Sequence, residues 1–200
     1  MSTAAVATRP GAVLADLLPA RSVPSTRVRD VALVVGGAVL TGVAAQVALP
    51  VPGSPVPVTG QTFAVLLVAL AFGPMRALLS MLLYLAVGMA GMPWFTDGTA
   101  GYAFPSLGYV LGFLLAALVV GNLARRGGDR TPLRTAGTMA AGSLSIYAVG
   151  VPYLALSTGM SATEAMAAGL VPFLIGDALK AALAMGAVPA VWKLLGRRDS

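Results

Sequence analysis

The chain contains no cysteine and no histidine, and only 10% of its 200 residues are charged. Without cysteine there is no disulfide framework and no iron–sulfur cluster. Without either residue, the commonest ligands of zinc and haem and the commonest general acid–base side chain are also missing. A soluble domain carries charge on about a quarter of its residues. The sequence therefore lacks the surface of a soluble protein and the side chains of most metalloenzymes.

Motifs of nucleotide hydrolysis and covalent catalysis are missing as well. The sequence has no G-x-x-x-x-G-K-[ST] phosphate-binding loop and no G-x-S-x-G nucleophile elbow. We therefore predict that the chain is not an enzyme and uses no cofactor. If it moves a solute uphill, the energy comes from a partner or from an ion gradient.

Long apolar runs are what the sequence does contain, with 58% hydrophobic residues. Crossing a bilayer core of ~30 Å takes about 20 helical residues, and these runs do not alternate as barrel strands do. We predict an all-α membrane protein with one six-helix transmembrane domain over residues 28–196. Residues 1–27 and 197–200 are predicted to be cytoplasmic tails, the first of them disordered. The six spans are expected at about 28–48, 58–72, 74–91, 105–124, 133–156 and 169–195.

The net charge of +6 could suggest nucleic-acid binding, but the basic residues gather at the ends of the apolar runs. With six spans, twelve of the thirteen Lys and Arg residues fall on one side of the membrane. Asp97 and Glu164 are the only charges expected on the opposite side. Because positively charged loops remain inside, both termini are predicted to be cytoplasmic.

Asp177 and Lys180 are the only charges set deep within an apolar run. One such charge at the centre of a membrane helix costs roughly 2.5–3.5 kcal/mol on insertion scales. Residues three apart on a helix share a face, so both side chains can reach one cavity and bind a planar polar ligand. A self-satisfying ion pair that only fixes helix packing, or a proton relay, would place the same residues there.

Three other features suggest binding surfaces. Gln61 opens the second run with an amide suited to a ureido or heteroaromatic group, although it could simply lie at the water interface. Tyr109 lies between two glycines and could stack on a ring, whereas most of the other aromatics fit an interfacial belt. In the first run, Ala38 and Gly42 form a small-residue pair that could dock a partner protein or only pack internally.

The order of these features resembles the BioY family, the biotin-binding S components of energy-coupling-factor transporters. The resemblance is carried by residues 55–62 (PVPVTGQT), 70–76 (LAFGPMR), 84–93 (YLAVGMAGMP), 105–109 (PSLGY) and 172–180 (PFLIGDALK).

That resemblance implies an S-component-like bundle in a prokaryotic cell membrane, with a loop after the first helix that closes over biotin. It implies ligand contacts from Asp177 and Lys180, a polar third-loop contact at Thr99, and a cavity that Gln61 and Tyr109 help to line. Transport would be energised by a transmembrane coupling protein and ATP-binding subunits, with the small-residue face of the first helix docking on the coupling protein. The alternative is a proton- or ion-coupled carrier of another small polar solute.

Overall fold

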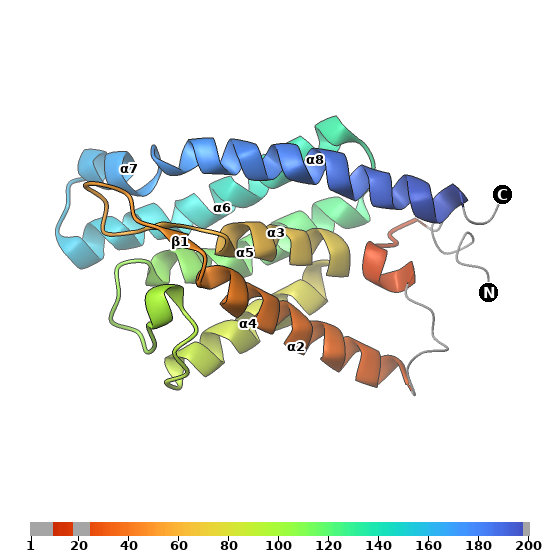
Figure 1. Ribbon diagram of the computed structural model, residues 1–200, viewed down its shortest axis with the longest axis horizontal. Coiled ribbons are helices and arrows are strands. Elements are labelled where there is room, and N and C mark those ends of the chain that lie inside the picture. The colour runs from red at the N-terminus through yellow and green to blue at the C-terminus, as the bar shows by residue number, and fades with distance from the viewer. Residues whose placement is uncertain (1–9, 18–24, 198–200) are drawn as a thin grey trace.

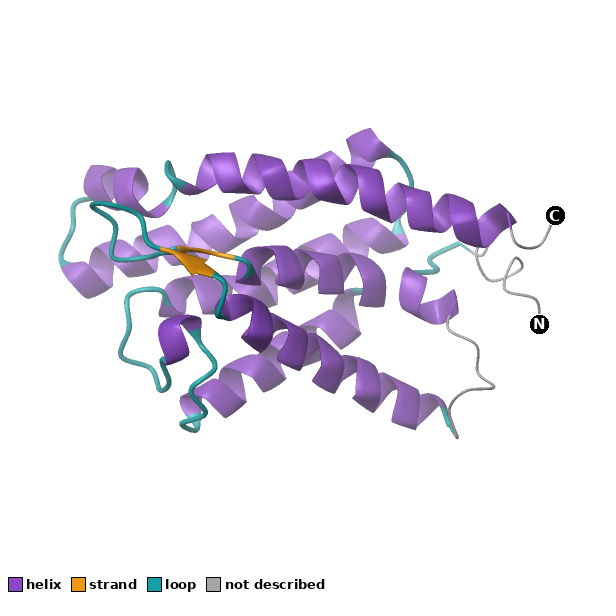
Figure 2. Cartoon of the chain, viewed as in Figure 1, coloured by secondary structure: helices purple, strands orange, loops and turns teal. Residues whose placement is uncertain are grey.

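The computed structural model describes residues 10–17 and 25–197, and almost all of its regular structure is helical (Figures 1 and 2). The only strands in these residues are β1 (Ala48–Leu49) and β2 (Val58–Thr59), an antiparallel pair that closes the proline-rich loop 50–57. The helices are the short 3-10 turns η1 (Leu14–Leu17) and η3 (Thr96–Gly98), and α2 (Thr26–Ala45), α3 (Gln61–Phe72), α4 (Pro74–Met89), α5 (Leu107–Arg125), α6 (Pro132–Thr158), α7 (Ala162–Gly169) and α8 (Phe173–Arg197).

The helix boundaries follow from local sequence chemistry. Gly73 adopts φ 80°, a conformation that glycine tolerates, and Pro74 then occupies the first turn of α4, so one apolar run becomes two helices. Thr131 caps α6 by accepting a hydrogen bond from the Arg134 amide, and Gly159 ends that helix in the left-handed region.

The long helices confirm a helical membrane protein, although the expected count of six spans is not reproduced by length alone. Among the described residues, four helices are long and apolar enough to cross a bilayer: α2, α5, α6 and α8. Helix α3 has 12 residues and α4 has 16, so they extend only about 18 and 24 Å.

The start of the last predicted span was wrong. The structure places α7 and a turn over residues 162–172, and α8 begins only at Phe173. Asp177 consequently lies in the second turn of its helix, nearer to the helix start than expected. The reason is local: Ser161 and Glu164 form a capping box that nucleates α7 as a helix of its own.

Helix α5 forms the centre of the bundle. It packs against α3, α4 and α6, and α8 packs mainly against α6 and also contacts α3. Buried apolar side chains from all of these helices form one core, which includes Leu66, Met81, Phe113 and Ile146. The loops 50–57 and 92–104 and helix α7 gather at the end of the bundle opposite the described part of the N-terminal segment (Figure 1).

At the end of the bundle where these loops gather, polar side chains attach the loop 92–104, called the third loop below, to the helices. Gln46 at the end of α2 donates to the carbonyls of Trp94 and Phe95, at 3.1 and 3.2 Å. The Trp94 indole donates to the Tyr84 carbonyl at 3.0 Å, and the two rings pack together. The third loop is therefore held by side chains of α2 and α4.

At the other end, residues 10–17 fold against the bundle, which corrects the expectation that they belong to a disordered tail. Val13 and Leu17 are buried, and η1 packs against α3, so the segment lies at the end of this short helix. The Arg130 guanidinium donates to the Ala12 carbonyl at 2.8 Å and stacks on the Trp192 ring. The apolar residues in this part of the predicted tail favoured such docking, because burying their side chains against the helices removes them from water.

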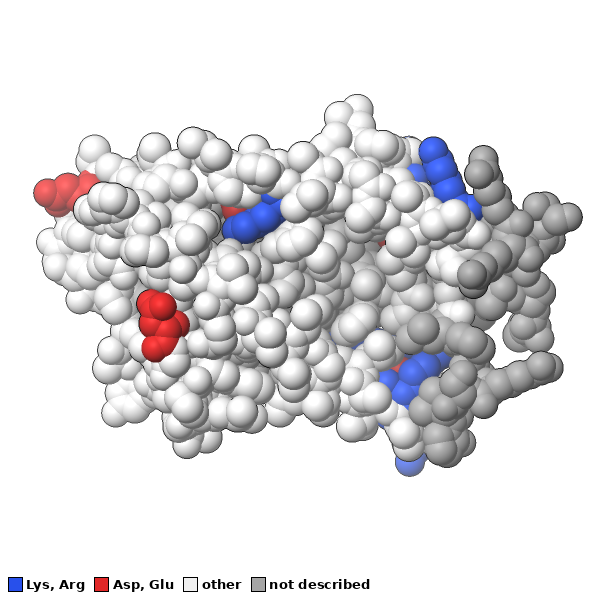
Figure 3. All heavy atoms as spheres, viewed as in Figure 1, with Lys and Arg blue, Asp and Glu red and all other residues white. Residues whose placement is uncertain are grey.

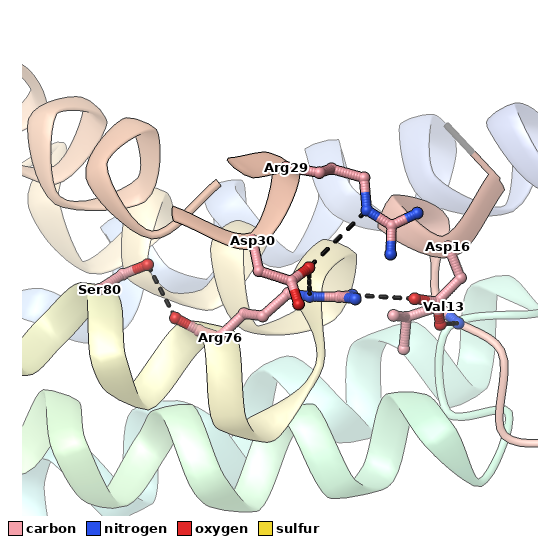
Figure 4. Close-up of polar contacts among 6 residues, drawn as sticks. All are labelled: Val13, Asp16, Arg29, Asp30, Arg76 and Ser80. Atoms are coloured by element: carbon pink, nitrogen blue, oxygen red, sulfur yellow. Dashed lines mark hydrogen bonds and ion pairs between the residues drawn. The ribbon is translucent and has the colours of Figure 1, made fainter. Parts of the chain in front are cut away.

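One arginine ties this N-terminal segment to two helices (Figure 4). The Arg76 side chain, in the first turn of α4, donates from Nη1 to Asp16 at 2.8 Å and from Nε to Asp30 of α2 at 3.0 Å. The second Asp16 oxygen accepts from the Val13 amide. Arg76 thus bridges η1, α2 and α4.

Candidate ligand-binding site

A cavity opens among α3, α5, α6 and α8, beneath the loop 50–57. It is narrow, with a volume of about 30 Å³. Its wall combines one carboxylate, one side-chain amide, several hydroxyl groups, and aromatic and aliphatic side chains. It is lined by Val56, Pro57, Thr59, Gln61, Thr62, Thr96, Ser106, Tyr109, Val110, Phe113, Ser143, Ile146, Tyr147, Phe173 and Asp177.

Asp177 is the charged group of this cavity. Its side chain is 15% exposed, and its Oδ2 accepts a 2.6 Å hydrogen bond from the Tyr147 hydroxyl of α6. Its Oδ1 lies 3.5 Å from the Lys180 ammonium, one helical turn further along α8. A carboxylate has about four acceptor positions, so further donors can still bind it.

Lys180 lies one helical turn beyond Asp177 on α8 and does not line the cavity. Its ammonium donates to the Thr62 hydroxyl of α3 at 2.7 Å and pairs with Asp177. Both expected charges therefore have protein partners, which offsets much of the cost of holding them within the apolar bundle. Thr62 was not singled out from the sequence, because only the fold brings α3 beside α8.

Gln61 is buried in the cavity wall at the start of α3. Its amide nitrogen donates to the Tyr84 hydroxyl at 2.6 Å, and its amide oxygen accepts from the Thr96 hydroxyl at 3.3 Å. The water-interface interpretation of Gln61 is therefore wrong. The residue joins α3, α4 and the third loop while facing the cavity.

The third loop reaches the cavity through a different residue from the one expected. Thr96 is buried and lines the wall, whereas Thr99 is exposed and its hydroxyl donates to the Thr96 carbonyl at 2.9 Å. Asp97, with φ 56°, turns the chain between them. Such a turn cannot be placed from a glycine-rich sequence alone.

Three aromatic rings that line the cavity with Asp177 pack against one another. The Tyr109 and Phe173 rings are stacked, with centroids 6.3 Å apart, and the Tyr147 ring meets both edge-on. The Tyr109 hydroxyl donates to the Gly169 carbonyl at 2.7 Å, which attaches α5 to the end of α7. Together these rings make an apolar surface suited to a compact ring system.

The small-residue pair of α2 lies elsewhere. Ala38 and Gly42 are both buried, and a Cβ at Gly42 would contact the Trp94 ring at 3.0 Å. In this structure the pair packs internally and does not form a free docking face. The exposed face of α2 carries another small pair, Ala32 and Gly36, among large aliphatic side chains.

Comparison with known proteins identifies the family. The sequence pattern of the BioY family matches residues 18–197 of this chain. The chain belongs to the BioY family. It is 35% identical over 162 residues to a probable biotin transporter BioY of Pyrococcus horikoshii, which covers 80% of this chain and 93% of that protein. It is 34% identical to the biotin transporter BioY2 of Lactococcus lactis subsp. cremoris, over 80% of this chain and 87% of the relative.

A solved structure shares the fold of this BioY chain. The S-component for biotin from an ECF-type ABC transporter superposes with a TM-score of 0.75, over 86% of this chain and 94% of its own length, at 20% sequence identity. The family resemblance drawn from the five sequence blocks is confirmed by these matches. The S-component-like arrangement of helices is confirmed by the superposition.

Proposed function

We propose that this BioY chain is a membrane-embedded, high-affinity biotin-binding subunit for biotin uptake, which performs no chemistry. The observation that carries the proposal is the Asp177 carboxylate in the wall of an aromatic-lined cavity. The BioY relatives are named as biotin transporters, and the superposed structure is an S-component for biotin.

The chemistry of biotin matches the polar groups of the cavity. Its ureido ring offers two N–H donors, which the free acceptor positions of Asp177 can bind, and one carbonyl, which Lys180, Gln61 or a threonine hydroxyl can bind. Its apolar bicycle would be buried against the aromatic rings, at about 25 cal/mol per Å². We keep Thr99 as a candidate contact of the third loop and add Thr96, which lies in the wall.

Binding also requires movement, because a cavity of about 30 Å³ has room for only a few water molecules. The loop 50–57 contributes Val56 and Pro57 to the wall, and the pairing of the two-residue strands β1 and β2 joins its two ends. We propose that this loop moves outward to admit biotin and then closes over it.

For the membrane arrangement, we propose six spans formed by α2, α3, α4, α5, α6 and α8, with both termini in the cytoplasm. The basic side chains on the visible face gather mainly at the end where the described N-terminal segment lies, and acidic ones at the opposite end (Figure 3). The band between them is almost uncharged, as a bilayer requires. The residues 10–17 at the end of α3 would then compensate for the shortness of that helix.

We further propose that the chain assembles with a transmembrane coupling protein and ATP-binding subunits, since it has no phosphate-binding loop of its own. The exposed face of α2 is the proposed docking surface. Its small residues Ala32 and Gly36 allow close backbone approach, which the buried Ala38 and Gly42 do not offer.

The test is isothermal titration of the detergent-solubilised chain with biotin. Tight binding is expected for the wild type, and Asp177→Asn should lose at least a hundredfold in affinity, about 2.7 kcal/mol, because the substitution removes the negative charge and replaces one acceptor oxygen with an NH₂ donor. Lys180→Ala should also weaken binding. Asp97→Asn is the matched control, since Asp97 is exposed and asparagine tolerates its positive φ.

Unfolding measurements on each variant separate loss of the site from loss of the fold. A folded wild-type protein that does not bind biotin would overturn the assignment. Equal binding by the wild type and the folded Asp177→Asn variant would keep biotin as the ligand and remove Asp177 from the site.

A further inference from the structure

The Tyr147 hydroxyl links two helices across the site. It donates from α6 to Asp177 Oδ2 of α8 at 2.6 Å, while Oδ1 of the same carboxylate faces Lys180. Among the described residues, this is the side-chain hydrogen bond that joins α6 directly to α8.

A second hollow lies on the other side of this link. It is a groove of about 300 Å³ between α6 and α8, and it shares Ser143, Tyr147 and Asp177 with the ligand cavity. Its rims are exposed and apolar: Leu144 is 65% exposed and Leu174 is 50% exposed. Both helices are of membrane-spanning length, so in the membrane arrangement proposed above this groove faces lipid acyl chains. The Tyr147–Asp177 pair is therefore the partition between the ligand cavity and the bilayer side.

We propose that Tyr147 is a positioning residue of the biotin site. Its hydroxyl holds the Asp177 carboxylate toward the cavity and joins α6 to α8 between the two hollows. This inference rests on the proposed function. Asp177 borders both hollows, and the hydrogen bond from Tyr147 holds its Oδ2 in the observed position. The hydroxyl fixes one carboxylate oxygen in place before biotin arrives, which reduces the ordering cost of binding.

The direct test is the affinity for biotin of Tyr147→Phe, which keeps the ring and its contacts with Tyr109 and Phe173 and removes only the hydroxyl. A loss of about tenfold is expected, the effect of one charge-assisted hydrogen bond. Tyr153→Phe is the matched control on the same helix: the Tyr153 hydroxyl makes no hydrogen bond to any described residue, and the side chain is not part of the cavity wall. Its affinity should equal that of the wild type.

A double-mutant cycle distinguishes positioning from general structural support. If the hydroxyl acts through the carboxylate, Tyr147→Phe should cause little further loss when it is added to Asp177→Asn. An equal loss in both backgrounds would show that Tyr147 only supports the fold, and would overturn the proposal.

Unchanged affinity of Tyr147→Phe in a wild-type background that binds biotin would also overturn it, without affecting the proposed function. Absence of biotin binding by the wild type itself would overturn the proposed function, and this inference would fail with it.

Discussion

Replacement of Arg76 by glutamine should loosen the N-terminal segment 10–17 without releasing it. Arg76 makes one ionic hydrogen bond to Asp16 of that segment and another to Asp30 of α2. Hydrogen bonds to charged groups contribute about 1.5–3 kcal/mol, but Asp16 and Asp30 are 31% and 45% exposed, so water screens both pairs. We therefore expect about 1 kcal/mol from the Asp16 bond, or roughly a fivefold increase in the detached population.

Burial of apolar side chains keeps the segment docked in this variant. Val13 is fully buried and Leu17 nearly so, and burying such side chains contributes about 1.5–3 kcal/mol each. The chain has no cysteine, so a cysteine introduced at Val13 is a unique probe of detachment. Its reaction with a maleimide should be slow and should become roughly fivefold faster when Arg76→Gln is added.

Two controls make this measurement decisive. A cysteine at Pro10, which is exposed in the same segment, should react rapidly in both backgrounds. Arg126→Gln removes an exposed arginine near the same end of the bundle and should leave the reaction at position 13 unchanged. If the position 13 probe reacts as fast as the position 10 probe in the wild type, the segment is not docked. An unchanged rate in Arg76→Gln would refute the role given to the ion pair.

Two further predictions concern stability. Gly121→Ala should destabilise the fold by about 1–3 kcal/mol, because its Cβ would overlap the backbone nitrogen of Pro74. Gly137→Ala, which meets open space, should not lower the melting temperature. The backbone amide and the hydroxyl of Ser161, which caps α7, donate hydrogen bonds to Glu164 and hold its pKa below the ordinary value of 4.5. The stabilisation from these bonds is therefore present above pH 4.5 and is lost as the pH falls through the lowered pKa. The melting-temperature difference between wild type and Glu164→Gln should therefore disappear in acid, and a difference independent of pH would contradict this.

Much of the fold could be predicted from the sequence, because membrane helices are specified by local composition. The break at Gly73 and Pro74 and the loop 50–57 were predicted from the backbone limits of glycine and proline. The extra helix α7 was not predicted, although Ser161 and Glu164 have the spacing of a capping box. That signal was overlooked within a run of small apolar residues.

The candidate site could be predicted from the sequence only in part. Asp177 stood out because a charge is costly inside an apolar run, and the structure places it with Gln61 and Tyr109 in one cavity. Tyr147 and Thr62 carried no comparable signal. A tyrosine or threonine is common in membrane helices, and its importance here comes from partners 30 and 118 residues away.

The sequence by itself determined that the chain is a helical membrane protein of the BioY family, with two charged residues three positions apart within its last apolar run. Hydrophobic length, the scarcity of charge and the ordered motifs are local properties, so they survive without coordinates. Only the tertiary structure decided which face of each helix is buried. Small residues four apart occur on two faces of α2, and packing chose Ala38 and Gly42 for the interior while leaving Ala32 and Gly36 exposed. Packing between distant segments also made Tyr147 the partner of Asp177, because that contact depends on how α6 and α8 lie against each other.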